Sequence, residues 1–555
     1  MREIYKRYVR ERYNDKGILV DYSLEYPDSF NFGYDVVDDI ALHEPDRRAM
    51  LWCNPAGEER LFTFADMKRL SDKTANFLRA QGVKKGDKVL VVLKRHYEFW
   101  YTAVALHKLG AVLIPATFML QAHDVEYRLR SADVVCVVAC ADCGVPAAVD
   151  EVEPVCPTLQ SKILVGAPRE GWVDFTSGVE AAGEDFERVE TNVLEPMILY
   201  FSSGTAGNPK MVLHDHTYAL AHLFTARHWH NVVPDGLHFT IADTGWGKAV
   251  WGKLYGQWLC EAGVFTYDFD KFVASEILER MEKYRITTFC VPPTMYRMML
   301  LADVKQYDLS SLTYCTTAGE AMPPEAFRAW KEATGISIME GYGQTETTVA
   351  LCNLKGMTPK PGSMGKPSPQ YRVTLMDADG DPCPTGVTGE VVISIKHGRP
   401  DGLLNCYYLD GEKTAEAMRG GWYHTGDTAW VDEDGYFWYV GRNDDIIKSS
   451  GYRIGPFEIE SVLVEHPAVR ECAVTGVPDE LRGQLVKATI VLSEGYEPSE
   501  ALTKELQEFV KKRTAPYKYP RVIAYTDELP HTVNGKVRRV EIRERDLAAA
   551  RAGNS

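Results

Sequence analysis

Apolar and polar positions alternate in two distinct ways along the first two-thirds of the chain. Residues 62–81 carry apolar side chains at helical spacing, and Gly82 follows as a stop signal, which predicts a helix. Short apolar runs rich in β-branched residues predict buried strands at 88–93, 111–115, 134–139 and 163–166. Strands separated by helices of about 10–15 residues are typical of βαβ units and a mostly parallel sheet.

Three polar, glycine-containing loops directly follow predicted strands. They are residues 202–210 after the run 196–201, residues 318–321 after 312–317, and residues 341–348 after 336–340. In open α/β sheets, ligands bind beyond the carboxyl ends of the strands. The three loops therefore predict one binding site at that edge of the sheet.

The pattern changes twice toward the C-terminus. From about residue 361 short strands and turns dominate, and Asp434-Gly435 is a hairpin signal. An α+β pattern follows Asp444, and it includes an amphipathic helix at 499–512. The chain is therefore predicted to have an α/β fold with a large N-terminal domain and a small C-terminal one. The domains are 1–443, with a β-rich subdomain at about 361–443, and 444–555.

Both ends of the chain carry weaker signals. The N-terminal stretch MREIYKRYVRERYNDKG has alternating charges that suit a solvated amphipathic helix, and it lacks the apolar core of a secretory signal. Residues 543–555 are polar and alanine-rich, which predicts a frayed end. No segment approaches the roughly 18 apolar residues of a membrane-spanning helix.

Composition and charge narrow the function classes. The 555 residues include 62 Lys and Arg against 78 Asp and Glu, a net charge of −16. Such a surface does not favour nonspecific nucleic-acid binding, which depends on displacing counterions from phosphates. An anionic nucleotide would have to be bound by local donors.

The cysteines are predicted to be reduced thiols. Of twelve, only Cys136, Cys140 and Cys143 approach a cluster, with the spacing C-x3-C-x2-C. A metal site needs a fourth ligand, and no Cys or His pair follows at zinc-finger spacing. Because Cys136 and Cys140 lie in an apolar run, core packing is favoured. Reduced thiols and no secretory signal predict a cytoplasmic location.

The loop within YFSSGTAGNPKMVL, residues 200–213, is a candidate phosphate site. Its small residues leave backbone N–H groups uncovered, and its three hydroxyls and Lys210 add donors and positive charge. It is not a Walker A loop, because the order after Gly204 is Gly-x-x-Gly-x-Pro-Lys. Taken alone, a loop of Ser and Gly is more often only a turn.

Four motifs in one order carry a family resemblance. YFSSGTAGNPK, EGYGQTETT, YHTGDTAWVDEDGYFWYVGRNDDIIKSSGYRIGPFEIES and PHTVNGKVRR resemble the signatures of the adenylate-forming superfamily, over roughly residues 40–542. Their order and spacing are most similar to acyl-CoA synthetases of the medium-chain group. The resemblance implies two steps. A carboxylate attacks the α-phosphorus of ATP and releases pyrophosphate, and the thiol of coenzyme A then displaces AMP to form a thioester.

The resemblance assigns a large residue set to ATP or AMP. The set is Ser202, Ser203, Gly204, Thr205, Ala206, Gly207, Lys210, Gly319, Glu320, Glu340, Gly341, Tyr342, Gly343, Gln344, Thr345, Asp427, Arg442, Arg453 and Lys536. Within it, Tyr342 would face adenine, and Asp427 and Arg442 would reach the ribose. Taken without the motif, Asp427 would more often be a turn residue.

Three of the matched residues are expected to act on the reacting atoms. Thr345 would donate to the α-phosphate, and Glu346 is a hard oxygen ligand suited to Mg²⁺. Lys536 would bridge the substrate carboxylate and the α-phosphate as a point charge. The catalytic set is thus Lys536, Thr345 and Glu346, with Glu346 as the metal ligand.

The C-terminal domain of this family moves between the two half-reactions. The resemblance places the hinge at Asp444 and assigns Ser450, Gly451, Tyr452 and Arg482 to coenzyme A. Positive charge for the CoA phosphates could come from Lys511, Lys512 and Arg513, or these residues form only the polar face of a helix.

The acid substrate is less defined. Gly245, Trp246 and Gly343 resemble the acyl pocket of medium-chain enzymes, and acetate-specific relatives have Trp where this chain has Gly343. Gly343 therefore predicts room for a medium-chain, branched or aryl acid. Trp246 either bounds the acyl tunnel or fills core volume.

Four alternatives stand beside this interpretation. A structural or scaffold protein is disfavoured, because the many polar glycine-containing loops would cost stability without a ligand. The others are an aryl-CoA ligase of the benzoate type, a stand-alone adenylation enzyme for a carrier protein, and a nucleotide-binding regulator without catalysis. The last is disfavoured because Lys536, Glu346 and Asp427 are all present. A homodimer is left open, and no nucleic-acid or membrane partner is expected.

Overall fold

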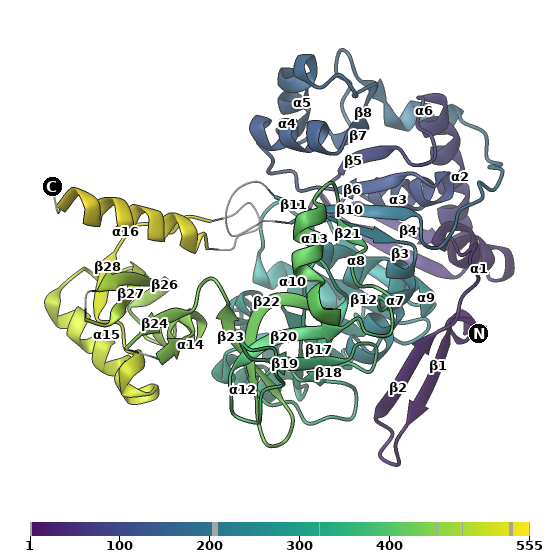
Figure 1. Cartoon of the computed structure of the whole chain (residues 1–555). Helices are drawn as coiled ribbons and strands as arrows, with labels where there is room; N and C mark the ends of the chain where they lie inside the picture. The colour runs from purple at the N-terminus through teal and green to yellow at the C-terminus, as the bar shows by residue number, and fades with distance from the viewer. Residues whose placement is uncertain are drawn as a thin grey trace. The chain divides into compact units, whose positions relative to one another are not determined.

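The computed structural model describes residues 3–202, 209–320, 322–450, 452–479, 481–531 and 537–553. Contacts divide the chain into two compact units (Figure 1). The first comprises Met1–Ser202, Lys210–Arg372 and Ile395–Glu416, and the second includes Val373–Ser394 and Ala417–Ser555. Two large, mostly parallel sheets build the first unit, which confirms the predicted α/β class.

The first large sheet has eight strands in a mixed order. The order is β21 (Cys406–Tyr407), β11 (Lys210–Asp215), β10 (Pro196–Ser202), β6 (Val112–Pro115), β5 (Lys88–Val92), β7 (Val134–Cys140), β8 (Ser161–Val165) and β9 (Val173–Asp174). Figure 1 shows α4 (Ala122–Ser131) and α5 (Val145–Val152) on one side of the strands and α2 (Phe64–Ala80) on the other. The central strands are buried on both faces, so they read as continuous apolar runs.

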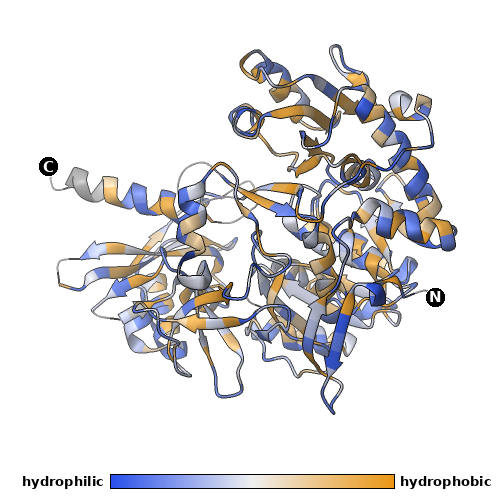
Figure 2. Cartoon of the chain, turned by 45° about the vertical axis from the view of Figure 1, so that its right-hand side comes forward, coloured by the Kyte–Doolittle hydropathy of each residue, from blue (hydrophilic) through white to orange (hydrophobic). Residues whose placement is uncertain are grey.

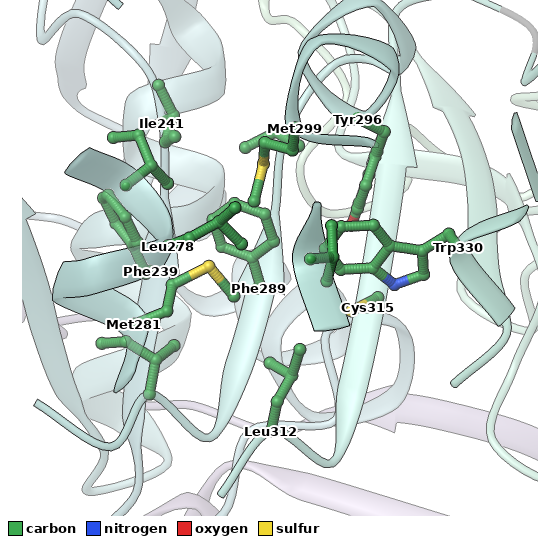
Figure 3. Close-up of a cluster of buried hydrophobic side chains, with 14 of the residues drawn as sticks. Phe239, Ile241, Leu278, Met281, Phe289, Tyr296, Met299, Leu312, Cys315 and Trp330 are labelled. Carbon is green, nitrogen blue, oxygen red and sulfur yellow. The ribbon is translucent and has the colours of Figure 1, made fainter. Parts of the chain in front are cut away.

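The second large sheet has nine strands. Their order is β18 (Lys366–Pro367), β17 (Val349–Cys352), β16 (Ile338–Gly343), β15 (Tyr314–Ala318), β14 (Thr288–Cys290), β12 (Leu237–Thr240), β13 (Gly263–Tyr267), β3 (Arg48–Cys53) and β4 (Glu59–Thr63). Its core packs against α10 (Ala274–Lys283), α11 (Pro293–Leu300) and α12 (Pro324–Thr334). Figure 3 shows apolar side chains from these strands and helices converging, among them Phe289, Met299 and Trp330.

Further helices of the first unit complete these layers. They are α1 (Asp39–His43), α3 (Glu98–Leu109), α6 (Phe175–Ala181), α7 (Thr217–Phe224), α8 (Gly247–Lys253), α9 (Tyr255–Leu259) and α13 (Gly411–Ala417). Helix α2 has one buried and one exposed face, and in Figure 2 such outer helices carry hydrophilic and hydrophobic residues side by side. Helices α3 and α7 are buried along their whole length. In the described part of the chain, no helix is both long and apolar enough to cross a membrane.

The N-terminus forms a hairpin, so the predicted solvated helix is wrong. β1 (Val9–Tyr13) pairs antiparallel with β2 (Leu19–Leu24). The Asn14 side chain accepts the backbone N–H groups of Lys16 and Ile18, and Gly17 has φ +71°, which closes the turn. Arg10 and Arg12 on β1 are exposed, whereas Glu11 between them faces inward and contacts Arg227 and His228.

The second unit contains two smaller sheets. One has the order β19 (Val373–Met376), β20 (Gly389–Ser394), β22 (Trp422–Val431) and β23 (Phe437–Arg442). The other orders β25 (Tyr452–Ile454), β24 (Ile447–Ser449), β27 (Gly483–Leu492) and β26 (Val469–Asp479), with β28 (Val522–Tyr525) beside β27. Its helices are α14 (Pro456–Leu463), α15 (Glu500–Arg513) and α16 (Arg539–Gly553).

The β-rich segment groups differently from its prediction. It was assigned to the N-terminal domain, whereas most of it lies in the second unit. Tyr439 on β23 meets Phe457 on α14 edge to face, with ring centroids 5.8 Å apart. At Gly455 a Cβ would lie 2.2 Å from the Val440 carbonyl oxygen, so this close packing requires glycine. The boundary at Asp444 stays a prediction.

The C-terminal segment is a helix rather than a frayed end. Ion pairs tie α16 to the rest of the second unit: Arg539 with Glu460 and Asp445, Arg543 with Asp445, and Lys487 with Asp546. Their partners lie about 60 to 100 positions away, so no local pattern signals them.

Candidate functional site

Parallel pairing of β15 and β16 brings two of the predicted loops together. Thr317 lies opposite Glu340, and Ala318 lies opposite Gly341. The segment Gly319-Glu320 therefore leaves the sheet beside the segment that begins at Gly341. Gly319 has φ +103°, and a Cβ built there would meet nothing within 4 Å, so this backbone borders open space.

Glu340 holds the backbone next to these loops through two hydrogen bonds. Its carboxylate is buried and accepts the backbone N–H groups of Met322, at 2.9 Å, and Gly362, at 2.7 Å. Burial raises the pKa of Glu340 to about 8, although both N–H donors act in the opposite direction. The described contacts of its carboxylate thus position backbone on either side of the site.

The edge of the first sheet meets the loop that follows β16. Tyr407 on β21 pairs with Val212 on β11 and donates its hydroxyl to Glu346 Oε1 at 3.0 Å. Lys210, at the start of β11, places its Nζ 5.2 Å from the centroid of the Tyr407 ring. The structure therefore gathers Lys210 and Glu346, which lie far apart in the sequence, around one tyrosine.

His214 forms a hydrogen bond with the same loop. Its Nε2 lies 2.8 Å from the carbonyl oxygen of Thr345, and because a carbonyl only accepts, Nε2 carries the proton. Burial lowers the pKa of His214 to about 4, so the imidazole is neutral near pH 7. The ring stacks on Tyr218 with centroids 4.0 Å apart. His214 thereby fixes the backbone that presents Thr345.

A short turn orders residues 344–347. The backbone N–H of Gln344 donates to Thr347 Oγ1 at 3.0 Å, and the N–H of Thr347 donates to the Gln344 carbonyl at 3.2 Å. Tyr342 precedes this turn, where the pairing of β16 with β17 shifts register between Tyr342 and Gly343. The bulge leaves Tyr342 half-buried at the end of the strand.

The predicted acyl-pocket residues have different surroundings. At Gly245 a Cβ would lie 2.1 Å from the Ala116 carbonyl carbon, so glycine permits the loop to touch the end of β6. Trp246 is half-buried, and among the described residues no acceptor reaches its buried Nε1. A buried donor in that state favours a ligand or water beside it.

Trp251 occupies the space beside Gly343. A Cβ at Gly343 would lie 2.4 Å from Trp251 Cη2 and 2.4 Å from the Thr348 carbonyl oxygen. Trp251 comes from α8 and donates Nε1–H to the Tyr218 hydroxyl at 3.3 Å. Gly343 therefore leaves no empty volume next to its own Cα, and an indole from another element forms the boundary.

In the second unit, Asp427 and Arg442 are brought together as the motif suggests. They lie opposite each other on β22 and β23, and Arg442 Nη1 is 3.3 Å from Asp427 Oδ1. The Tyr439 hydroxyl lies 3.2 Å from the same oxygen, and Arg442 also donates to the Thr425 carbonyl. Asp427 is a buried carboxylate on a strand, rather than an exposed turn residue.

Three residues expected at coenzyme A also converge. The N–H of Ser450 donates to the Arg482 carbonyl at 2.8 Å, and Arg482 Nη1 donates to Ser450 Oγ at 3.2 Å. Ser450 has φ +50°, which is strained for a residue with a side chain. Tyr452 stacks on Tyr517 with centroids 4.0 Å apart and is half exposed. Asp444 lies 3.6 Å from Arg442 Nε.

Several predicted residues lie outside the described part of the chain. They are Ser203, Gly204, Thr205, Ala206, Gly207, Gly451 and Lys536, together with the side chain of Arg453. Sequence reasoning missed His214, Trp251 and Tyr407, which contact the predicted loops from other elements. No local motif marks them, because only the sheet order places them there.

Comparison with known proteins identifies the family. The AMP-binding enzyme family matches residues 37–408, and the AMP-binding enzyme C-terminal domain matches residues 458–536. The chain belongs to the AMP-binding enzyme family. This confirms the resemblance to adenylate-forming enzymes. The predicted boundary at Asp444 falls between the two matched segments.

Full-length relatives and solved structures agree with this assignment. Acyl-coenzyme A synthetase ACSM3, mitochondrial, of Homo sapiens is 42% identical over 543 residues, covering 96% of this chain and 92% of the relative. The anthranilate CoA ligase AuaEII, solved with anthranoyl-AMP, has a TM-score of 0.85 and 31% identity, covering 95% of this chain and 99% of that chain. A benzoate CoA ligase from Burkholderia xenovorans LB400 has a TM-score of 0.79 and 28% identity, covering 93% and 100%.

The expected cytoplasmic location is wrong by the same comparison. The ACSM3 relatives of Homo sapiens, Mus musculus and Rattus norvegicus are named as mitochondrial proteins. The cytoplasmic expectation rested on reduced thiols, and the cysteines of the structure are free thiols. They do not distinguish the cytoplasm from other reducing compartments.

Proposed function

We propose that this chain is an AMP-forming acyl-CoA synthetase. It would join a carboxylic acid to ATP with release of pyrophosphate, and then transfer the acyl group to coenzyme A with release of AMP. The observation that carries the proposal is 42% identity to an acyl-coenzyme A synthetase across 96% of the chain. The gathering of Lys210, Thr345 and Glu346 at the strand ends supports it.

Adenylation depends on positioning and on charge stabilisation. Lys210 and the loop 202–207 would hold the β- and γ-phosphates, and Thr345, held from below by His214, would donate to the α-phosphate. Lys536 would neutralise charge between the carboxylate and the α-phosphorus. A bond then forms from the carboxylate oxygen to phosphorus as the bond to pyrophosphate breaks.

Glu346 is the proposed Mg²⁺ ligand. Its carboxylate is largely buried, and Tyr407 orients one of its oxygens, so a hard cation would meet a fixed oxygen donor. Mg²⁺ would supply positive charge against the phosphates. Tyr407 would keep the carboxylate in one rotamer.

The nucleoside and coenzyme A would use the second set of residues. Glu320, Gly341 and Tyr342 would border adenine, and Asp427 with Arg442 would bind the ribose hydroxyls. In the thioester step, Ser450, Tyr452 and Arg482 would line the path of coenzyme A. The thiol loses its proton, sulfur bonds to the acyl carbon, and AMP leaves with the bonding electron pair. The proposed reaction does not depend on whether the enzyme is a homodimer.

The substrate is proposed to be a medium-chain, branched or aryl acid. Trp246 and Trp251 would form aromatic walls, and Gly343 would let Trp251 approach closely. An aryl-CoA ligase is the second candidate, because the structural neighbours include ligases named for anthranilate and benzoate.

A panel of acids tests the activity and the substrate together. Purified protein with ATP and Mg²⁺ is assayed for acid-dependent pyrophosphate release with straight acids from acetate to dodecanoate, branched acids, benzoate and anthranilate. We expect release with at least one acid larger than acetate, and CoA-dependent AMP formation with the same acid. AMP formation that needs a carrier protein instead of coenzyme A, or no pyrophosphate release with any acid, would contradict the proposal.

A further inference from the structure

Four potential metal ligands converge at the ends of two strands of the first sheet. His96 follows β5, Cys140 ends β7, and Asp142 and Cys143 lie in the turn that leads into α5. The His96, Cys140 and Asp142 ligand atoms all lie within 4.8 Å of one another. This cluster contains no residue of the proposed adenylation site.

Two of the ligand pairs have separations close to the edges of a tetrahedral zinc site. Cys140 Sγ and Cys143 Sγ are 3.5 Å apart, and His96 Nε2 is 3.4 Å from Asp142 Oδ1. Zinc bonds of about 2.3 Å to sulfur and about 2.1 Å to nitrogen or oxygen give tetrahedral edges of about 3.8 Å and 3.4 Å respectively. His96, Cys140 and Asp142 would have to draw closer together to bind one ion. Cys143 would have to join them from its place beside Cys140.

The surrounding charges favour such an ion. Lys94 Nζ lies 2.6 Å from Asp142 Oδ2, which leaves Oδ1 toward His96. Two thiolates and one carboxylate carry three negative charges, and a divalent ion with the Lys94 ammonium balances them.

We propose that His96, Cys140, Asp142 and Cys143 bind one Zn²⁺ ion as a structural clip. Thiolate and imidazole ligands select zinc over Mg²⁺ or Ca²⁺. The clip would fasten the end of β7 to the loop after β5. Because His96 Nε2 is 3.8 Å from Asp268, which follows β13, the ion would lie where the two large sheets approach each other. Asp142 is exposed, so it provides the path of entry for the ion.

This proposal revises the expectation drawn from spacing alone. The pair Cys140 and Cys143 lacks a second Cys or His pair at zinc-finger distance. His96 comes from the loop after β5, 44 positions before Cys140, and the parallel pairing of β5 with β7 brings it near. Cys136, in contrast, is fully buried in β7 and stays a core residue.

Cobalt substitution tests the site without relying on activity. The full-length protein is stripped with a chelator under reducing conditions, titrated with Co²⁺, and followed by thiolate-to-cobalt charge-transfer absorption. We expect one Co²⁺ per chain, displacement by an equal amount of Zn²⁺, and a higher midpoint of thermal unfolding with Zn²⁺. No charge-transfer band in the wild-type protein would overturn the proposal.

Variants assign the ligands. Cys143→Ser should lose the charge-transfer band or weaken Co²⁺ binding at least tenfold, and His96→Gln should weaken it similarly. Cys383→Ser is the matched control, because Cys383 is a half-buried thiol in the other unit. Unchanged Co²⁺ binding in Cys143→Ser would overturn the proposal. So would a Cys140–Cys143 disulfide that forms in the wild-type protein under air while Zn²⁺ is present.

Discussion

At the scale of the residue, position 343 requires glycine because two groups pack directly against its backbone. Trp251 Cη2 and the Thr348 carbonyl oxygen would both lie 2.4 Å from a Cβ at this position. Any larger residue at 343 would have to move backbone as well as an indole. A Gly343→Trp variant therefore changes packing and pocket together, and Trp251 is the cleaner position at which to test the acyl pocket.

Replacing Trp251 should change which acids are used. Trp251→Phe removes the part of the indole nearest Gly343, so bulkier acids should gain relative to small ones. Contacts of this size are worth about 1–3 kcal/mol, so we expect the ratio of kcat/KM between a bulky and a small acid to rise about tenfold or more. The measurement is CoA-dependent AMP formation across the acid panel.

Trp330→Phe is the control for this experiment. Trp330 is fully buried in the core of the second sheet, so the same substitution there should lower stability without altering the ratio. An unchanged ratio in Trp251→Phe would show that this indole does not bound the acyl group.

At the scale of the element, a carboxylate on the hairpin β1–β2 bonds to the segment that follows α7, where Tyr22 of the hairpin also packs on Phe224 and His228. Glu11 on β1 accepts hydrogen bonds from Arg227 Nε, at 2.9 Å, and from His228 Nε2, at 2.8 Å. Burial would raise the pKa of Glu11, but the hydrogen bonds with His228 and Arg227 outweigh it and lower the pKa to about 2. The carboxylate therefore stabilises the folded protein only while it is ionised.

Loss of this carboxylate should have a defined pH dependence. The folded pKa of about 2 lies below the ordinary value of 4.5, so the stabilisation is complete above pH 4.5 and is lost as the pH falls toward 2. Glu11→Gln should lower the midpoint of thermal unfolding at pH 7 by an amount that corresponds to about 1–3 kcal/mol. The deficit should be equal at pH 7 and about pH 6 and shrink at about pH 4.

Glu25→Gln provides the control on the same hairpin. Glu25 pairs with Arg10 at the surface, where half of its side chain is exposed, so its loss should cost little at any pH. A Glu11→Gln deficit that grows as the pH falls would contradict the assignment.

The same element shows where pattern reasoning succeeds and fails. The strand predicted at 88–93 is β5, which a continuous apolar run marks. The helix predicted at 62–81 is α2, which its one apolar face marks. The segment that forms β1 was predicted as a helix because the charges in VRERY fit the period of a helix as well as that of a strand. The signal for the hairpin lay in Asn14 and Gly17, which shape its turn.

At the scale of the whole molecule, the motifs marked residues on loops but not those that hold the loops. Glu346 and Asp427 stand in recognisable motifs. Tyr407, which orients Glu346, lies on a two-residue strand whose partner β11 is almost two hundred positions earlier. Pairing across such distances depends on sheet order, which periodicity does not contain. The sequence therefore predicted which loops form the site, but not the residues of other elements that hold those loops in place.

Separate tests of the two half-reactions examine how the C-terminal residues divide the work. Lys536→Ala should lower acid-dependent pyrophosphate release at least a hundredfold, because it removes the charge proposed to stabilise the adenylation transition state. Thioester formation from a supplied acyl-adenylate should stay within a few-fold of wild type. The matched variant Arg482→Ala should do the reverse, because Arg482 sits beside Ser450 on the proposed path of coenzyme A. Equal losses in both half-reactions for either variant would contradict the division, since a residue that serves only one step leaves the other intact.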